Sequence, residues 1–385
     1  MQRPNVHIQI FEKSDKLLSK VKISGGGRCN VTNHCLENSE LIKNYPRGRK
    51  ELVQVFAQFS VEQTIAWFLQ NGVTLVTEED GRMFPKSNNS DTMVQCFLNL
   101  AKKHNISILT KCEVFAIQKH QHFILKTSQG VFEADALICA AGGHHKSGAY
   151  DWIKNLGHKI DAPIPSLFTF NLPHSNIKKE LQGISVANAK VSVQKTKFNY
   201  EGPVLITHWG LSGPAVLKLS AFAAKEFNDL NYLATILVNW VHPFTIEETE
   251  AELKKIQAAK HKASPFSNPA FHLPKRLWDF LCEQADIDKQ KPWAEISLKH
   301  IRKLALLLQQ SEYKMEGKTT FKEEFVTCGG VNLKEVDFKT MQSKIIPKLY
   351  FCGEVLNIDG ITGGFNFQNA WSTAWVAAKS IHLNN

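Results

Sequence analysis

The feature that most constrains the fold is a pattern of strand and glycine-rich loop that opens the chain and returns in its last 65 residues. Residues 6–11 alternate like a strand, and residues 24–30 follow with three consecutive glycines. Near the other end, a strand is predicted at 348–352, a second glycine-rich loop at 359–364 and a helix at 366–381. Because a strand followed by a glycine-rich loop occurs at both ends of the chain, we predict an α/β domain that is interrupted by an insertion.

An apolar run within this domain points to a ligand crevice. Residues 136–141 are wholly apolar and end in Gly142 and Gly143. Such a run is typical of a buried parallel strand whose carboxyl end opens onto a binding crevice. Apolar residues at helical spacing predict a helix over 51–70 and another over 91–104.

The middle of the chain has a different character. It is β-rich over 165–240 and helical over 245–316, where Thr245 begins one helix and residues 298–310 form another. A length of 385 residues allows two or three domains. We therefore expect a first domain at 1–160 and 321–385, a β-barrel-like insert at 161–243 and a helical insert at 244–320.

The spacing of the cysteines and the hydropathy of the chain indicate its cellular compartment. The eight cysteines are scattered without CxxC or Cys/His spacing, so neither a zinc site nor a disulfide framework is indicated. No apolar run approaches the ~20 residues that a membrane helix needs, and the start has no apolar signal region. We expect a cytoplasmic protein that does not span a membrane and holds no metal. The oligomeric state is left open.

The net charge of +10 is unevenly distributed. Residues 1–50 hold ten basic and four acidic residues, and residues 175–320 hold twenty and fifteen. The densest cluster contains Arg47, Arg49 and Lys50. Such a balance can attract RNA, but a solvated basic surface with no partner is an equally good interpretation.

Several motifs occur together in a specific order. They are FEK (11–13), SGGGRCNVTN (24–33), GRMFPKS (81–87), ICAAGG (138–143), THWGLSGPAVL (207–217), TCGGV (327–331) and LYFCGEVLNIDGITGGFNFQNAW (349–371). In these motifs the chain resembles the BaiN-like (YhiN-like) flavoproteins over nearly its whole length. The resemblance implies an FAD-dependent oxidoreductase with a fold of the two-dinucleotide-binding-domain class.

The resemblance also implies which residues hold FAD. Glu12 and Lys13 would lie at the ribose of the AMP half, with a surface residue at a strand end as the alternative for Glu12. Asp359 would be a polar contact of the flavin, or only a turn residue. The glycine loops would face the flavin, and the last helix would point its N-terminus at the flavin edge that becomes negative on reduction. The remaining predicted contacts are Ser24, Gly25, Gly26, Gly27, Arg28, Val114, Ala141, Gly142, Gly353, Glu354, Gly363, Gly364, Phe365 and Asn366.

One departure from the family pattern concerns the phosphate loop. Family members begin with a strand, a G-x-G-x-x-G turn and a helix, and no G-x-G-x-x-G occurs in this sequence. We expect the first strand of the parallel sheet to be missing, through either a misassigned start or a true truncation. We expect FAD binding to be weaker for that reason.

Candidate catalytic groups are few. Reducing a polarised C=C bond requires a proton donor, and Cys29 in the flavin-facing loop is the best-placed thiol, with a buried structural cysteine as the alternative. Asn30 and His208 are weaker candidates. The family implies NAD(P)H as reductant. Among the substrates that the family implies, the basic excess favours uridine in ribosomal RNA. A steroid-like small molecule as substrate, and a cofactor-free remnant that only binds RNA or a partner, are the alternatives.

Overall fold

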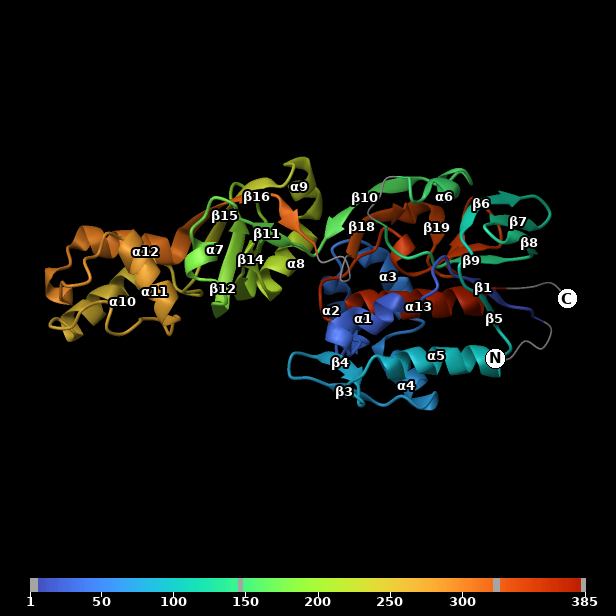
Figure 1. Ribbon diagram of the computed structural model, residues 1–385, viewed down its shortest axis with the longest axis horizontal. Helices are drawn as coiled ribbons and strands as arrows, with labels where there is room; N and C mark the ends of the chain where they lie inside the picture. Colours follow the sequence, from blue (N-terminus) through green and yellow to red (C-terminus); the bar gives the residue numbers. More distant parts are fainter. Residues whose placement is uncertain (1–5, 145–147, 321–325, 382–385) are drawn as a thin grey trace. The chain divides into compact units, whose positions relative to one another are not determined.

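The computed structural model describes residues 6–144, 148–320 and 326–381. The chain divides into two compact units, which we call unit 1 (Met1–Ser166 with Phe321–Asn385) and unit 2 (Leu167–Thr320). Figure 1 shows both units. The first boundary lies after Ser166 and not at residue 160, because β10 (Ile160–Ser166) pairs antiparallel with β18 (Val326–Val331) inside unit 1. Within the described residues, no helix has the length and apolarity needed to cross a bilayer.

Unit 1 contains two parallel strand pairs. β1 (Gln9–Phe11) pairs with β5 (Ser107–Leu109), and β9 (Leu137–Cys139) pairs with β21 (Leu349–Phe351). The second pair joins the predicted apolar strand to the last segment of the chain, as the pattern at the two ends required. β21 also pairs antiparallel with β20 (Gln342–Ser343), which in turn pairs antiparallel with β19 (Val336–Asp337). The fold class predicted from the sequence, an interrupted α/β domain with a parallel sheet, is therefore confirmed.

The other strands of unit 1 form two small antiparallel sheets. β2 (Thr32–Asn33), β4 (Arg82–Pro85) and β3 (Leu75–Thr77) make one, and β6 (Val114–Lys119), β7 (Phe123–Thr127) and β8 (Gly130–Ala134) make the other. The helices are α1 (Ser19–Gly27), α2 (Asn38–Leu41), α3 (Arg49–Phe56), α4 (Val61–Gln70), α5 (Asp91–Lys103), α6 (Asp151–Lys154) and α13 (Phe365–Ser380), with 3-10 turns η1 (Ile42–Asn44), η3 (Leu333–Glu335) and η4 (Gly353–Val355).

The single helix predicted over 51–70 is wrong, because this segment contains α3 and α4. The first helix ends at Phe56, and Ser60 is the N-cap at which the second begins. Its backbone N–H donates to the Gln63 side chain, and the two residues form a capping box at the start of α4. A capping box satisfies N–H groups that a new helix leaves unpaired, so the chain restarts here despite its continuous apolar spacing.

An aromatic cluster fixes α13 against α4 and α5. The ring of Trp371 stacks on Phe97 at 5.5 Å and meets Phe68 edge-on at 5.8 Å. Val21 of α1 and the following Cys29 belong to the same core cluster. The N-terminal glycine loop and the C-terminal helix are thus held by one core, although they lie at opposite ends of the sequence.

Unit 2 is built on a seven-stranded antiparallel sheet. The strands, in the order in which they pair, are β16 (Ser311–Glu316), β15 (Leu233–Asn239), β12 (Ser185–Val193), β13 (Asn199–Ile206), β14 (Gly210–Ser212), β11 (Thr169–Asn171) and β17 (Lys318–Thr319). The first and last of these strands are separated in the chain by Gly317 alone. The sheet must therefore curl until its ends meet, which gives the barrel-like form expected from the sequence.

The helices of unit 2 share the core of this sheet. They are α7 (Ile177–Glu180), α8 (Pro214–Phe222), α9 (Ala224–Asp229), α10 (Ile246–Ala259), α11 (Lys275–Gln284) and α12 (Leu298–Gln310), with the 3-10 turn η2 (Trp293–Glu295). Thr245 caps α10, and α12 has the predicted bounds. Residues 311–319 are strands of the sheet, and Trp278 of α11 lies in the same cluster as Phe168 and Trp240. The helical segment is thus inserted between β15 and β16 and belongs to a single core with the sheet.

Candidate cofactor site

Glu354 joins three segments of unit 1. Its carboxylate accepts hydrogen bonds from the backbone N–H of Thr327 (3.0 Å) and of Gly143 (3.3 Å), and from Lys20 Nζ of α1 (2.6 Å). A Cβ at Gly143 would lie 2.4 Å from the Glu354 carboxylate, so a larger residue there would have to displace that carboxylate. The preceding Gly353 is buried and donates its N–H to Thr373 of α13. The predicted residues of β21 and of the loop after β9 are therefore brought together.

The glycine loop at the end of α1 presents open backbone. The helical backbone stops at Ser24, and the next three residues, Gly25, Gly26 and Gly27, all have positive φ. A Cβ built on Gly26 or Gly27 would meet no atom of the described chain within 4 Å. Both residues are exposed, so the loop offers bare peptide groups to a ligand.

The neighbouring Arg28 is occupied by contacts within the protein. Its guanidinium donates to Glu78 (2.6 Å) and lies 3.9 Å from the centre of the Phe84 ring. A Cβ at Gly25 would approach the same ring to 3.0 Å. Arg28 and Gly25 therefore position the loop, and Gly26 and Gly27 form its open part.

The N-terminus of α13 lies against the strand that follows this loop. A Cβ at Gly364 would lie 2.4 Å from the Thr32 carbonyl oxygen. With its amide oriented to satisfy both partners, Asn30 donates to Thr32 O and accepts from the Gly364 N–H, each at 3.0 Å. Gly363 accepts a hydrogen bond from Asn33 through its carbonyl (3.2 Å). The two glycine loops are thus joined by direct hydrogen bonds.

Two predicted contacts at the start of α13 have partners inside the protein. The Asn366 side chain both accepts from and donates to the backbone of Gly360, at 2.8 and 2.9 Å. Phe365 is buried, and its carbonyl accepts the Tyr45 hydroxyl (2.7 Å). Their side chains hold the second glycine loop in shape, and the backbone N–H groups of the first helical turn are what this end can offer to an anion.

The predicted ribose contacts Glu12 and Lys13 follow the end of β1, and the predicted cofactor residue Val114 is the first residue of β6. The Glu12 carboxylate accepts the Ser14 N–H (2.7 Å), and Lys13 forms an ion pair with Glu113 (2.5 Å), next to Val114. The backbone of Glu12 also pairs with Leu109 and Cys112. The ion pair with Glu113 therefore brings Lys13 and the adjoining Glu12 close to Val114.

His144 connects this region to Glu354, and sequence reasoning missed it. Burial lowers the pKa of His144, the charges of Lys20 and Lys13 lower it further, and Glu354 opposes the change. The hydroxyl of Tyr150 accepts the His144 N–H and donates to the Gly142 carbonyl, which fixes the loop holding Ala141 and Gly142. In the sequence, only their positions near glycine-rich loops could have indicated Lys20 and His144 as site residues.

The interpretation of Asp359 as a turn residue or flavin contact does not describe its main role. Its fully buried carboxylate is paired with the Arg47 guanidinium and accepts the Ser166 hydroxyl (2.7 Å). Burial raises the pKa of Asp359, and Arg47 opposes that shift. The Arg47 side chain is only 12% exposed, so it is not part of the free basic surface suggested by the cluster with Arg49 and Lys50.

Cys29 lies in the core of unit 1. Its side chain has no exposed surface, and burial raises the pKa of the thiol to about 11, opposed by a hydrogen bond with Ser24. The left-handed backbone at Cys29 (φ 62°) turns the side chain inward from an otherwise open loop. The structure therefore gives this thiol no access to a substrate, in contrast to the predicted role as proton donor.

Thiol labelling of the native protein checks this placement. Cys35 is half-buried, whereas the other seven cysteines are buried. We expect iodoacetamide at mildly alkaline pH to modify Cys35 and to leave Cys29 intact, because a buried neutral thiol is a poor nucleophile. Mass spectrometry of tryptic peptides measures both sites. Rapid modification of Cys29 in folded protein would contradict its burial.

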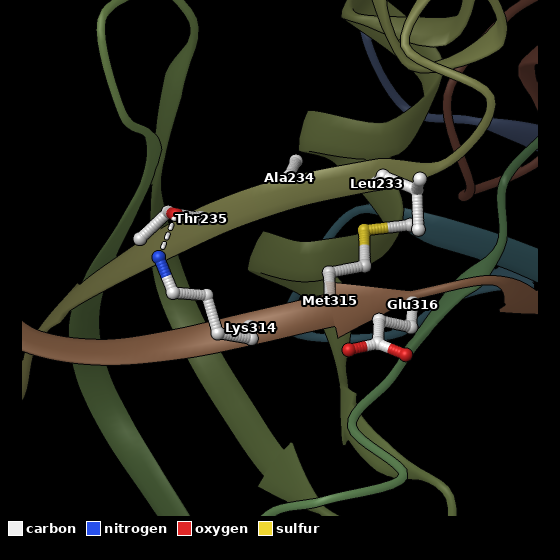
Figure 2. Close-up of a pocket in the computed structure, with 6 residues that line it drawn as sticks. All are labelled: Leu233, Ala234, Thr235, Lys314, Met315 and Glu316. Atoms are coloured by element: carbon white, nitrogen blue, oxygen red, sulfur yellow. Dashed lines mark hydrogen bonds between the residues drawn. The ribbon is translucent and has the colours of Figure 1, made fainter.

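The remaining candidate, His208, belongs to unit 2, where a pocket also lies. That pocket is a shallow hollow of about 330 Å³ on β15 and β16 (Figure 2). Lys314 extends from β16 to β15 and donates to Thr235 (2.8 Å). Neither His208 nor any predicted cofactor residue lines this hollow, so it is not the cofactor site.

The residues gathered in unit 1 fit FAD. Open backbone at Gly26 and Gly27, basic groups around His144 and the N-terminus of a long helix suit a flavin dinucleotide with a diphosphate. The Thr327 hydroxyl is buried beside Glu354 and has no hydrogen-bond partner within the described part of the chain. A bound ligand with polar oxygens would satisfy it.

Comparison with known proteins agrees with this assignment. The profile of the HI0933-like protein Rossmann domain matches residues 1–380. A protein of Escherichia coli (strain K12) named ribosomal RNA dihydrouridine synthase is 27% identical over 97% of this chain and 92% of its own length. Its namesake in Haemophilus influenzae has the same values. The 3-dehydro-bile acid delta(4,6)-reductase of Clostridium scindens is 23% identical, covering 98% of this chain and 93% of its own.

Proposed function

Because the chain belongs to the HI0933-like family, we propose that it reduces uridine in ribosomal RNA to dihydrouridine. The family agrees with the resemblance found in the sequence motifs and with the chain's class as a flavoprotein oxidoreductase. NAD(P)H is the proposed source of hydride. Two relatives with this named activity, each aligned over 97% of the chain, support the substrate. A net charge of +10 suits a polyanionic substrate, and the cytoplasm is the proposed compartment.

The FAD-binding part of the proposal rests on one observation, the hydrogen bonds that join the two glycine loops through Asn30. It places the open backbone of Gly26 and Gly27 in the same assembly as the N-terminus of α13. Bound FAD would supply hydride transfer to an electron-poor C=C bond. Peptide N–H groups at a helix N-terminus favour negative charge, so α13 would stabilise the anionic reduced ring.

Other residues of unit 1 would hold the rest of the dinucleotide. Glu12 would accept hydrogen bonds from the ribose of the AMP half. Lys20 and His144 would donate to the diphosphate, and the Thr327 hydroxyl would find its missing partner there. Two of these residues already contact Glu354, Lys20 through its ammonium group and Thr327 through its backbone N–H.

The test is mass spectrometry of nucleosides from ribosomal RNA of a strain that lacks the gene. Loss of dihydrouridine, restored by the gene on a plasmid, is the expected result. The purified protein supplied with FAD, NAD(P)H and ribosomal RNA should form the same product. Unchanged dihydrouridine, together with NAD(P)H oxidation only in the presence of a steroid enone, would favour the second candidate. That candidate, a small-molecule reductase, is supported by the bile-acid reductase relative.

Two glycines allow a matched test of the FAD-binding loop. Gly26 and Gly72 both have positive φ, 68° and 82°, and each faces open space. Valine costs roughly 1–2 kcal/mol of backbone strain at either position. We expect Gly26→Val to weaken FAD binding at least about tenfold and Gly72→Val to leave it unchanged, since only the first lies in the loop. Equal FAD affinity in both variants, measured by flavin fluorescence, would place the cofactor elsewhere.

A further inference from the structure

Unit 2 exposes a pair of aromatic side chains at the turn between β13 and β14. Trp209 is 46% exposed, and His208 beside it is exposed too, with the ring centres 4.9 Å apart. An indole that is nearly half exposed leaves a large apolar surface in water. Such a surface is suited to stacking against a flat partner.

The turn that carries Trp209 is held rigidly. Thr207 and Gly210 exchange two backbone hydrogen bonds, of 2.7 and 3.2 Å, and the Thr207 hydroxyl accepts the Trp209 N–H (3.3 Å). The Trp209 carbonyl accepts the Leu172 N–H (2.9 Å). A Cβ at Gly210 would lie 2.3 Å from the Phe170 carbonyl oxygen, so the strand after the turn packs closely against β11 and requires glycine there. The indole is therefore presented at a fixed place, which lowers the entropy cost of binding.

Basic side chains lie next to this turn. Leu172, which bonds Trp209, leads into Pro173, whose carbonyl accepts the Lys178 ammonium. At the other side, Gly183 bonds the carbonyl of Ile206, and Arg276 donates to the carbonyls of the adjoining Glu180 and Gln182. α7 (Figure 1), with Lys178 and the exposed Lys179, lies in the segment between these two contacts, and Arg276 of α11 is bonded to the same segment. Glu180 is the acidic residue among them, and the balance is positive.

We propose that this surface, formed by Lys178, Lys179, His208, Trp209 and Arg276, binds single-stranded RNA. The inference rests on the proposed function and specifies where the substrate is held. A nucleobase would stack on the Trp209 indole, and the cations would contact neighbouring phosphates. Exposed aromatic side chains among basic ones are the usual means of holding unpaired nucleotides, because every base has a flat face and every linkage a negative charge.

The test measures binding of a fluorescently labelled, single-stranded, uridine-rich oligonucleotide to the full-length protein by anisotropy. Trp209→Ala is expected to weaken binding about tenfold, whereas Trp209→Phe, which keeps a flat ring, should remain within about threefold of the parent. Leu233→Ala is the matched control, since Leu233 is 58% exposed in the same unit and lies outside the surface. Lys179→Ala should lower the slope of log affinity against log salt by about 0.7.

Dihydrouridine formation by the same variants separates the two proposals. Weakened RNA binding by Trp209→Ala supports the surface whether or not the parent protein makes dihydrouridine. If the parent makes dihydrouridine and Trp209→Ala binds RNA as tightly as Leu233→Ala does, the surface is overturned and the function stands. A parent protein that binds an acidic peptide but not the oligonucleotide overturns the surface as an RNA site.

Discussion

Replacing Arg47 with alanine is expected to lower the free energy of unfolding of unit 1 by about 3–5 kcal/mol. The substitution removes the cation that faces Asp359, whose carboxylate has no exposed surface. The Ser166 hydroxyl would remain as its other hydrogen-bond partner. A buried carboxylate left with one neutral donor must either keep an uncompensated charge or take up a proton, and both destabilise the folded state.

Chemical denaturation of the full chain, followed by circular dichroism, measures this effect. Arg49→Ala is the matched control, because Arg49 is an exposed arginine two residues away and should change stability by less than about 0.5 kcal/mol. The double variant Arg47→Ala with Asp359→Ala should recover part of the loss, since it removes both charges. Equal midpoints for Arg47→Ala and Arg49→Ala would show that the pair does not stabilise the fold.

Replacing Gly364 with valine is expected to have the second large effect. It should lower the free energy of unfolding by about 2–5 kcal/mol and abolish FAD binding. The new Cβ would lie 2.4 Å from the Thr32 carbonyl oxygen and 2.5 Å from its carbon, and backbone atoms cannot rotate away. The positive φ of 94° adds strain. The helix would have to move off β2, which breaks the Asn30 hydrogen bond between the two glycine loops.

Gly130→Val is the control for Gly364→Val. Gly130 also has positive φ (130°), but a Cβ there meets no described atom within 4 Å. It should show the backbone strain without the collision. Thermal unfolding and flavin fluorescence report the two effects separately. If Gly364→Val unfolds at the same temperature as Gly130→Val and still binds FAD, the contact between α13 and β2 is not required.

Local signals in the sequence predicted much of the fold. The apolar run before Gly142 is a parallel strand, residues 298–310 form a helix with the predicted ends, and the α/β domain is interrupted by an insert. Each of these features is encoded by neighbouring residues or by the order of motifs. The helix break at Ser60 was equally local, but the apolar spacing on both sides concealed it.

The site was predicted less completely because its contacts join distant segments. Asp359 meets Arg47 across 312 residues, and no periodicity reveals such a partner. Gly364 was attributed to a cofactor, whereas the structure shows that the Thr32 backbone also requires a glycine there. Cys29 belongs to a glycine-rich loop, which suggested exposure, but its left-handed backbone points the thiol into the core.

The division of unit 1 into two stretches of chain has a consequence for synthesis. All strands of the unit 2 sheet lie between residues 169 and 319, so this unit can fold as soon as they have left the ribosome. β9 must wait for β21, and the glycine loop of α1 must wait for α13, which ends at Ser380. Because domains generally fold as units during translation, unit 2 of the nascent chain is already folded while unit 1 is still incomplete. The residues that precede the insert are therefore the longest exposed to proteases and most dependent on chaperones.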